Sequence, residues 1–479
     1  MNPLPEMTNF RTRRTDDGIL HLVFDMPDRS MNVFSNKAIH EIEAFAGWLE
    51  QADVTGVVVS SGKPGAFCAG ADLTELAEAY EMIMATPKAE RDALTVAHFS
   101  PIGRAFRKLE TAGKPVAIAV HGLALGGGCE FFLACHYRVL TDAKETQIGL
   151  PESLVGLLPG GGGTQRLPRF TGAARSLGVL LEGARFSAQQ AVETGAASIA
   201  VPAGEEIAAA EAWIRSKPDP RQPWDRPDWT APTRDEVLAV TRPVREKILR
   251  ETGGHYPAEL AILDCLDRGL PGGMDAGIAA EIDIFKDLVQ RIEPRNMIAV
   301  LFLGRVEYDK RRRKGALPQG LDAFAGKVKA AMEEKARALG ANGAAALVFA
   351  GVGGAASGDV AAAQAVAGRL PQWFEEPHGA VEEAAFAILG AGALVAATDG
   401  GAFAAADRNL VDLHCQQAAG FPRYLGGPFT FLARHGGVAG MSRVTHDLLL
   451  RSYLESEESK ELSAAFGAKR KPDPAKFGR

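Results

Sequence analysis

The chain has 479 residues, 46% of them hydrophobic, so it can bury a large core, and at about 150 residues per domain we expect two or three folded units. Its formal net charge of −6 at pH 7 argues against a nucleic-acid-binding protein, which is normally basic. No apolar run reaches the roughly 20 residues needed to cross a bilayer, and residues 1–14 contain no signal-peptide core.

The five cysteines are spread along the chain without a C-x-x-C pair. An odd number of such cysteines fits a reducing compartment, and their spacing predicts no metal site. We therefore expect a cytoplasmic protein with no membrane-spanning segment and no nucleic-acid partner.

The first part of the chain repeats a pattern of strand, turn and helix. Residues 18–24 and 57–60 are typical of strands, and Ile39, Ile42 and Leu49 share one face of a helix between them. The repetition predicts an architecture built from successive strand–turn–helix units, one for each repeat of the pattern.

Asp72 follows a glycine-bearing loop, residues 61–71, and precedes a predicted helix. Glu75 stands three residues later, which is the spacing of a capping box. A helix N-cap is therefore the favoured interpretation of Asp72, and a catalytic role is the alternative.

The centre of the sequence is a predicted buried strand, residues 115–120, followed by the glycines of 126–128 and a predicted helix, residues 129–135. Glycines at this junction let the backbone approach a ligand with its N–H groups pointing outward, at the positive end of the helix dipole. Two carboxylates, Glu130 and Glu152, follow. This arrangement suits a reaction that develops negative charge on oxygen while protons move.

Four stretches of the sequence are typical of one family: GAFCAGADL (65–73), HGLALGGGCE (121–130), PE (151–152) and LPGGGGTQRLP (158–168). In them the chain resembles the crotonase, or enoyl-CoA hydratase/isomerase, superfamily. Residues 255–310 look like the connector of multifunctional fatty-acid oxidation proteins, so the resemblance is closest to the hydratase half of those proteins.

The resemblance implies an α/β fold, a ββα spiral over residues 1–215, followed by an α-helical connector and an all-α domain. It also implies an acyl-CoA thioester substrate. No separate cofactor is expected, since coenzyme A is part of the substrate.

The resemblance assigns the backbone N–H groups of Ala71 and Gly127 to an oxyanion hole for the thioester oxygen. We assign Glu130 as the base that deprotonates water and Glu152 as the acid that protonates Cα, with the reverse assignment left open because the two titrate as a pair. Further candidates for substrate binding are Ala69, Asp72, Leu73 and Gly160.

Other polar residues near these motifs have simpler interpretations. His121 is expected to be a structural histidine at a strand end, and Cys68 and Cys129 to be small packing residues. The structural alternative for Glu130 is a buried ion pair. With no nucleophile–base pair in the motifs, covalent hydrolysis is the poorer prediction.

Residues 216–314 are expected to form a proline-rich linker or wrapping arm and connector helices, and 315–479 a helical domain that resembles the C-terminal domain of 3-hydroxyacyl-CoA dehydrogenases. The basic run 310–314 is interpreted as a solvated helix end, with a landing site for CoA phosphates as the alternative. The glycines of 346–356 are interpreted as a loop between helices, so we expect no NAD binding.

These observations lead to an enoyl-CoA hydratase of fatty-acid β-oxidation. The alternatives are a Δ3-Δ2-enoyl-CoA isomerase and a CoA-binding scaffold for separate dehydrogenase or thiolase subunits. Because we expect the helices of 235–308 to pack on their own hydratase core, a monomer or small homo-oligomer is predicted.

Overall fold

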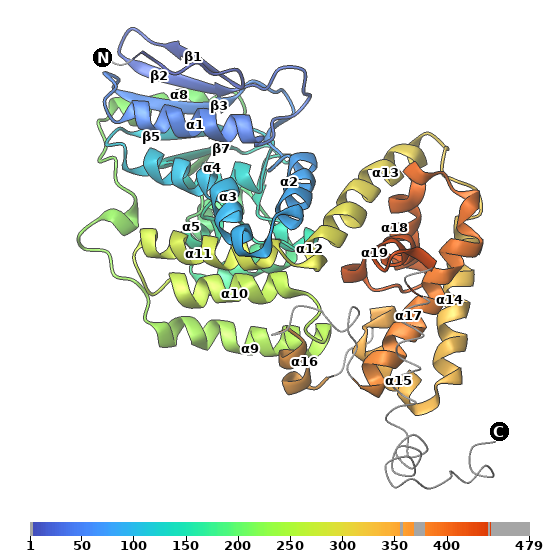
Figure 1. Ribbon diagram of the computed structural model, residues 1–479. Coiled ribbons are helices and arrows are strands. Elements are labelled where there is room, and N and C mark those ends of the chain that lie inside the picture. The colour runs from blue at the N-terminus through green and yellow to red at the C-terminus, as the bar shows by residue number, and fades with distance from the viewer. Residues whose placement is uncertain (1–2, 355–357, 368–378, 439–440, 442–479) are drawn as a thin grey trace, which may run out of the picture. The chain divides into compact units, whose positions relative to one another are not determined.

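A computed structural model describes residues 3–354, 358–367, 379–438 and 441. The chain forms two compact units, Met1–Ile298 and Ala299–Arg479 (Figure 1). The boundary between them falls inside the predicted connector, residues 216–314. The three-part division at residues 215 and 314 stays a prediction.

The first unit contains a six-stranded sheet in the order β1-β2-β3-β5-β7-β10. β1 is antiparallel to β2, and the other neighbours run parallel. Its strands are β1 (Phe10–Arg14), β2 (Ile19–Phe24), β3 (Gly56–Ser61), β5 (Val116–Val120), β7 (Tyr137–Thr141) and β10 (Ile199–Val201).

A second sheet has the order β4-β6-β8-β9, of which only β8 and β9 are antiparallel. The chain alternates between the two sheets, so that β3, β5 and β7 are each followed by a short strand of the second sheet. This is the ββα spiral that the resemblance implies. The short strands are β4 (Ala66–Cys68), β6 (Leu123–Leu125), β8 (Gln147–Gly149) and β9 (Arg185–Ser187).

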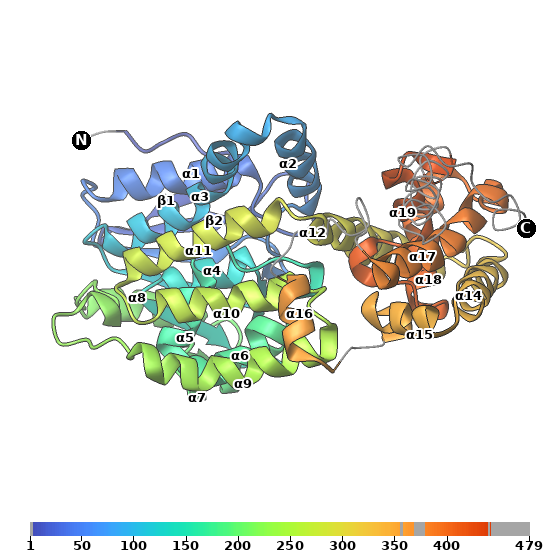
Figure 2. The ribbon, with the colours of Figure 1, turned by 60° about the horizontal axis from the view of Figure 1, so that its bottom comes forward.

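Helices follow the paired strands and cover the sheets (Figures 1 and 2). The predicted helix around residue 42 is present, and the side chain of Ser35 caps it by accepting from the Ala38 N–H at 3.2 Å. The helices are α1 (Asn36–Leu49), α2 (Leu73–Ala85), α3 (Lys88–Thr111), α4 (Gly127–Ala134), α5 (Gly163–Thr171), α6 (Ala173–Glu182), α7 (Ala188–Thr194) and α8 (Glu206–Arg215), with the 3-10 turns η1 (Glu152–Val155) and η2 (Pro223–Asp225).

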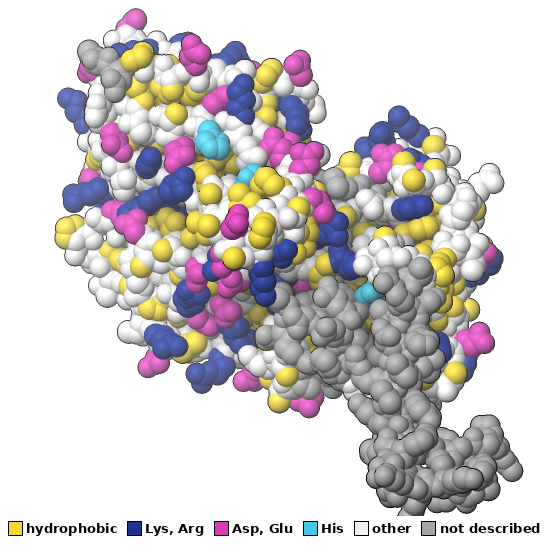
Figure 3. Space-filling view, in the orientation of Figure 1, with side chains coloured by type: hydrophobic (Ala, Val, Ile, Leu, Met, Phe, Trp, Pro, Cys, Tyr) yellow, Lys and Arg dark blue, Asp and Glu magenta, His cyan; other side chains and the backbone are white. Residues whose placement is uncertain are grey.

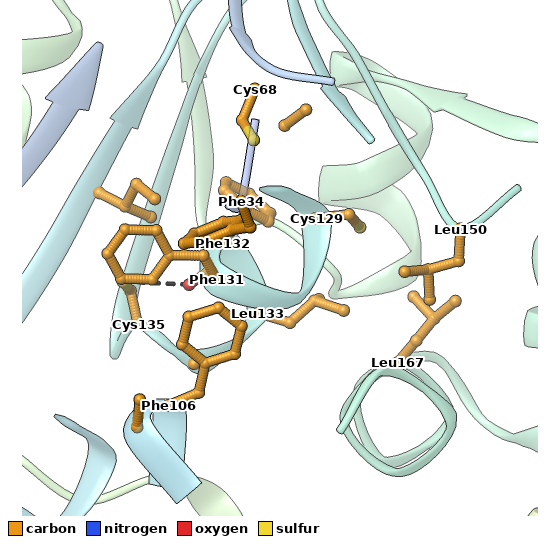
Figure 4. Packing of buried hydrophobic residues seen from close by; sticks show 14 of the residues in the cluster. Phe34, Cys68, Phe106, Cys129, Phe131, Phe132, Leu133, Cys135, Leu150 and Leu167 are labelled. Carbon is orange, nitrogen blue, oxygen red and sulfur yellow. Dashed lines mark hydrogen bonds between the residues drawn. The ribbon is translucent and has the colours of Figure 1, made fainter. Parts of the chain in front are cut away.

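The core surrounds α4, all of whose residues are buried. Figure 4 shows Phe106 and Phe131 close together, and their rings stack with centroids 5.2 Å apart. Phe34 meets both rings edge-on. Because α4 is packed on all sides, its N-terminal turn has a fixed position at the ends of β4 and β6.

The proline-rich segment that follows α8 is a wrapping arm. The side-chain amide of Gln222 is buried and donates to the carbonyls of Leu133, Ala134 and Cys135 at the C-terminus of α4. Trp224 is also buried and packs edge-on against Phe170. The arm therefore belongs to the first unit.

Connector helices follow the arm and lie side by side (Figures 1 and 2). α10 and α11 contact α5, α9 contacts α6, and α12 contacts η1. The predicted packing on the chain's own core is thus observed up to residue 298, while residues 299–308 belong to the second unit. The helices are α9 (Arg234–Thr252), α10 (Pro257–Gly269), α11 (Met274–Val289) and α12 (Ile292–Met297).

The described residues of the second unit contain helices and no strand. The basic run ends α13, where residues 312–314 are exposed, as predicted for a solvated helix end. The loop predicted for residues 346–356 begins later, because residues 346–349 are the end of α15; residues 350–354 form a turn, and residues 355–356 lie outside the described residues. The helices are α13 (Arg305–Arg313), α14 (Leu321–Ala338), α15 (Gly340–Phe349), α16 (Val360–Ala367), α17 (Ala380–Thr398), α18 (Arg408–Ala418) and α19 (Pro428–Arg434).

Within this unit, α17 is long and apolar enough to cross a membrane, by length and composition alone. Its side chains Phe386, Ile388 and Leu389 are buried, and the helix contacts α14, α15 and α19. This is the packing of a core helix. The buried Asp412 accepts from the amides of Phe429 and Thr430 and so fixes the start of α19.

Several elements of the first unit were not predicted: the strands β1, β4, β6, β8 and β9 and the helices α3 and α8. Of these, β4 lies in the segment 61–71, which was predicted as a loop. β1 and β6 are short strands whose pairing, instead of a periodic pattern, decides their conformation. β6 occupies part of the segment predicted as a turn between residues 120 and 126. The helix α3 has a low share of apolar residues and no cap signal, since Pro87 occupies its N-cap position.

Candidate active site

Two glycine-bearing segments meet at the start of α4. Gly126 has φ 54° and ψ −128°, a backbone conformation open essentially to glycine alone. A Cβ at Gly126 would lie 3.3 Å from the Cα of Gly70 and 3.2 Å from Oε1 of Glu152. The segments that carry Ala71 and Gly127 are therefore in contact, with the Glu152 carboxylate beside them.

The N–H of Ala71 is directed away from the neighbouring strand-like segment. Phe34 pairs with the peptides on both sides of Ala71, donating to Gly70 O at 2.8 Å and accepting from Asp72 N at 3.0 Å. In such a parallel bridge the residue between the two bonds points its own N–H to the other side. Ala71 is also an exposed residue.

Gly127 is the first residue of α4, and its N–H has no acceptor within the helix. No side chain caps this helix. Its first-turn amides carry the positive end of the dipole. Since Gly127 follows Gly126 as Ala71 follows Gly70, two backbone donors lie at adjoining positions. Their assignment to an oxyanion hole stays a prediction.

Glu130 lies one turn into α4 and is buried. Its Oε1 accepts from the amides of Gly161 at 2.7 Å and Gly163 at 2.8 Å. A Cβ at Gly161 would lie 2.7 Å from Oε2 of Glu130, so this close approach needs glycine. Burial raises the pKa of Glu130, while the two amide bonds and the charge of Arg166 act in the opposite direction.

Glu130 is thus held by backbone amides. The sequence alternative, a buried ion pair, does not describe it, because the nearby guanidinium of Arg166 pairs with Glu110.

Glu152 begins η1 and differs from Glu130 in its bonding. Its Oε2 is buried and has no hydrogen-bond partner among the described residues. Burial first, and then the charges of Glu130 and Glu281, raise the pKa of Glu152 well above its usual range. A buried carboxyl oxygen without a partner is unusual and points to a functional group.

A third carboxylate, Glu281 on α11, reaches the same turn. It is 1% exposed, and it accepts from the amides of Gly162 at 2.7 Å and Thr164 at 3.1 Å and from the Thr164 hydroxyl. Burial and the charge of Glu130 raise the pKa of Glu281 to about 8.

Arg166 ties the turn to α3. Its guanidinium makes two bonds to the Glu110 carboxylate, at 2.7 and 3.0 Å, and donates to the carbonyl of Gly161 at 2.7 Å. Both side chains of the ion pair are completely buried. Glu110 is in turn contacted by Arg107 at 3.3 Å, which bonds Asp225 of the wrapping arm.

The other predicted binding residues lie around these groups. Asp72 caps α2, accepting from the Thr74 and Glu75 amides, and pairs with Arg29 at 2.7 Å, which confirms the N-cap interpretation. Ala69 is exposed and Leu73 half-buried. Gly160 opens the turn opposite the Phe285 ring. Contact of these four residues with a substrate stays a prediction.

His121 and the two cysteines fit their structural interpretations. The His121 ring contacts the carbonyl of Lys63 at 2.6 Å. Cys68 and Cys129 are fully buried, and burial raises the pKa of Cys68 to about 12, so neither forms a thiolate at neutral pH. In the described part of the chain, no three His, Cys, Asp or Glu side chains are grouped to hold a metal ion.

Sequence reasoning missed Glu281 and the amides of Gly161 and Gly163. A signal for Glu281 exists in its own helix, since Gly277, Ile284 and Phe285 on the same face of α11 are all buried. An acid within an apolar stripe is costly unless it has partners. Which partners it finds, more than a hundred residues earlier, is visible only in the fold.

Comparisons with known proteins show what the first unit is similar to. The enoyl-CoA hydratase/isomerase family model matches residues 14–219. The chain is similar to the fatty acid oxidation complex subunit alpha of Shewanella frigidimarina, 34% identical over 317 residues, which cover 65% of this chain and 43% of the relative. The same subunit of Shewanella loihica is 36% identical over 304 residues, covering 61% of this chain and 41% of the relative.

The chain therefore spans less than half the length of the curated relatives it matches. Among solved structures, an enoyl-CoA hydratase from Rhodobacter sphaeroides 2.4.1 is similar, at 22% identity and TM-score 0.48, covering 62% of this chain and 90% of that chain.

The buried ion pair generates a stability prediction. Replacing Glu110 by Gln leaves the Arg166 charge buried and unpaired, so the free energy of unfolding should fall by about 3–5 kcal/mol in urea denaturation. Glu43→Gln is the matched control. Its partner Arg104 has a side chain that is 53% exposed, so the expected loss is about 0–1 kcal/mol. Equal losses in the two variants would contradict this account.

Proposed function

Because residues 14–219 form a domain of the enoyl-CoA hydratase/isomerase family, we propose that this chain is an enoyl-CoA hydratase that converts 2-trans-enoyl-CoA to 3-hydroxyacyl-CoA in fatty-acid β-oxidation. One observation carries the proposal. Two buried carboxylates beside two outward backbone donors are bonded unequally, Glu130 by two amides and Glu152 Oε2 by none.

The difference in hydrogen bonding between Glu130 and Glu152 indicates which of the two is the base and which is the acid. The two amides and the Arg166 charge favour ionised Glu130, whereas Oε2 of Glu152 accepts no hydrogen bond from the described residues. When the pair holds one proton, that proton therefore resides on Glu152.

The reaction then follows in two proton transfers. The thioester carbonyl accepts from the N–H groups of Ala71 and Gly127, which stabilise the charge that develops on its oxygen. Glu130 takes a proton from water as the water oxygen bonds to Cβ, and Glu152 gives its proton to Cα. The two proton transfers leave Glu130 protonated and Glu152 ionised, and exchange of a proton between the pair and water restores the starting state.

Hydration is preferred to isomerisation because both carboxylates are present at the donors. Moving a double bond along the acyl chain needs one proton-transferring group and no water, whereas adding water uses one group as base and one as acid. The scaffold alternative gives no reason to bury two carboxylates beside unused backbone donors.

The relatives are named as alpha subunits of a fatty acid oxidation complex, which supports acyl-CoA as substrate and a further protein as partner. We propose a dehydrogenase or thiolase as that partner. On the face of the molecule in Figure 3, acidic and basic side chains are interspersed over the first unit. With α9 to α12 covering their own core, we propose a monomer or small homo-oligomer.

Each carboxylate can be tested alone. Glu130→Gln and Glu152→Gln should each lower kcat for crotonyl-CoA hydration by about 10²–10⁴-fold, the range for losing general acid or base catalysis. The assay is the loss of absorbance of the enoyl thioester, with circular dichroism to show that each variant is folded. Full activity in either folded variant would remove that residue from the mechanism.

A pH dependence follows from the raised pKa of Glu152. The acid must be protonated, so kcat should fall as the pH rises through this pKa. Because burial and nearby negative charge raise it, the fall should come well above about 4.3, where an unperturbed glutamate titrates. A kcat–pH profile measures this, and a rate that already declines between pH 5 and 6 would contradict the assignment.

A further inference from the structure

The turn between Glu130 and α5 shows an alternating pattern. Four consecutive amides, from Gly161 to Thr164, bond to two carboxylates in turn: residues 161 and 163 donate to Glu130, and residues 162 and 164 donate to Glu281. The turn is thus held between α4, which carries Glu130, and α11, which carries Glu281.

The two carboxylates occupy the N-terminus of α5, where unsatisfied amides and the helix dipole favour negative charge. One carboxylate would be enough to cap the N-terminus of α5, so the second carboxylate needs a further explanation. Glu281 is also fully enclosed, with Gln165 and Cys265 around its Thr164 partner, and the Gln165 side chain donates to both the Thr164 hydroxyl and the Cys265 carbonyl. Hydrogen bonds of fixed geometry therefore hold Glu281 in place, in addition to the helix dipole.

We propose that Glu281 is a positioning residue of the hydratase site, which fixes the turn 160–164 so that the Gly161 and Gly163 amides hold Oε1 of Glu130 and orient its carboxylate toward water. The inference rests on the proposed function. It assigns part of the catalytic geometry to the connector, outside the family domain of residues 14–219.

The geometry leaves little freedom for this turn. Gly162 N and Gly161 N bind carboxylates on different helices, and the Gly161 carbonyl accepts from Arg166. Without the hydrogen bonds to Glu281, the Gly162 and Thr164 amides would lose their acceptors, and the backbone of the turn could change its orientation. Glu130 would then lose the alignment of its two donors, and misplacement by about 1 Å can cost about 10²-fold in rate.

Several charged or titratable groups surround Glu281: Glu130 on α4, Glu152 on η1, Arg166 and Arg169 on α5, and Cys265 on α10. Above about pH 8, where Glu281 is ionised, its negative charge helps to keep Glu152 protonated. Removing it should lower the pKa of Glu152, so the alkaline fall of kcat should move to lower pH.

The test is Glu281→Gln in the full chain, assayed with crotonyl-CoA. Glutamine can still accept from the Gly162 amide, but its NH2 group would face the Thr164 amide, donor against donor. We expect kcat to fall about 10- to 100-fold with KM changed by less than about threefold, because the turn positions Glu130 and the acyl-CoA contacts remain. The alkaline fall of kcat should come at lower pH than in the wild type.

Asp283→Asn is the matched control, since Asp283 lies two residues along the same helix, is 48% exposed in its side chain and pairs with Arg268 at the surface. It should keep the wild-type kcat and pH profile. A second variant, Thr164→Val, retains the Glu281 carboxyl group and its two amide bonds but removes the contact with the Thr164 hydroxyl. It should lower kcat by a smaller factor, about 2- to 10-fold, again at nearly constant KM.

The outcomes separate the two proposals. A folded Glu281→Gln variant with wild-type kcat and pH profile would overturn the positioning role while leaving the hydratase proposal intact. If that variant fails to fold, an unchanged kcat in Thr164→Val overturns it instead, and a reduced kcat at constant KM supports it. A folded wild-type chain that hydrates no enoyl-CoA would overturn both proposals.

Discussion

The site depends on one constraint: buried carboxylates need hydrogen-bond donors, and a short glycine turn supplies them. Amides of the turn from Gly161 to Thr164 serve Glu130 and Glu281 alternately. A charged side chain could have paired with either acid, but the guanidinium of Arg166 is engaged by Glu110, and that of Arg169 donates to Gln165 and to the carbonyls of Gly269 and Gly272. Backbone donors leave Glu130 with an open oxygen, where a bidentate guanidinium would have occupied both.

The spiral fold brings these groups together from distant parts of the chain. Each passage through the two sheets ends near the same place, so the loop after β4, the start of α4 and the turn η1 meet there. The wrapping arm and the connector then close the outside of this arrangement. Through Glu281, the connector also reaches the turn that holds Glu130, which links a helix outside residues 14–219 to the candidate site.

Much of this could be predicted from the sequence because its signals are local. Patterns within a few residues predict the strand β5, the helix α4 and the N-cap at Asp72. The family resemblance and the neighbouring glycines predict Glu130 and Glu152 as site residues, and this assignment stays a prediction. The fold of the first unit follows from the same resemblance.

The rest depends on contacts that no local pattern encodes. β6 forms because β4 and β8 flank it, and three residues are too few to show a period. The unequal bonding of Glu130 and Glu152 comes from amides about thirty residues after Glu130. Glu281 contacts the turn from 117 residues away, so only the folded chain shows what it binds.

The most direct test of this account is an isotope experiment on the wild-type chain. Crotonyl-CoA incubated with the protein in ¹⁸O-labelled water should give a 3-hydroxyacyl-CoA that carries one labelled oxygen, detected by mass spectrometry, because the hydroxyl comes from the water that Glu130 deprotonates. Recovery of the substrate unchanged, or of a shifted double bond without added oxygen, would contradict the account.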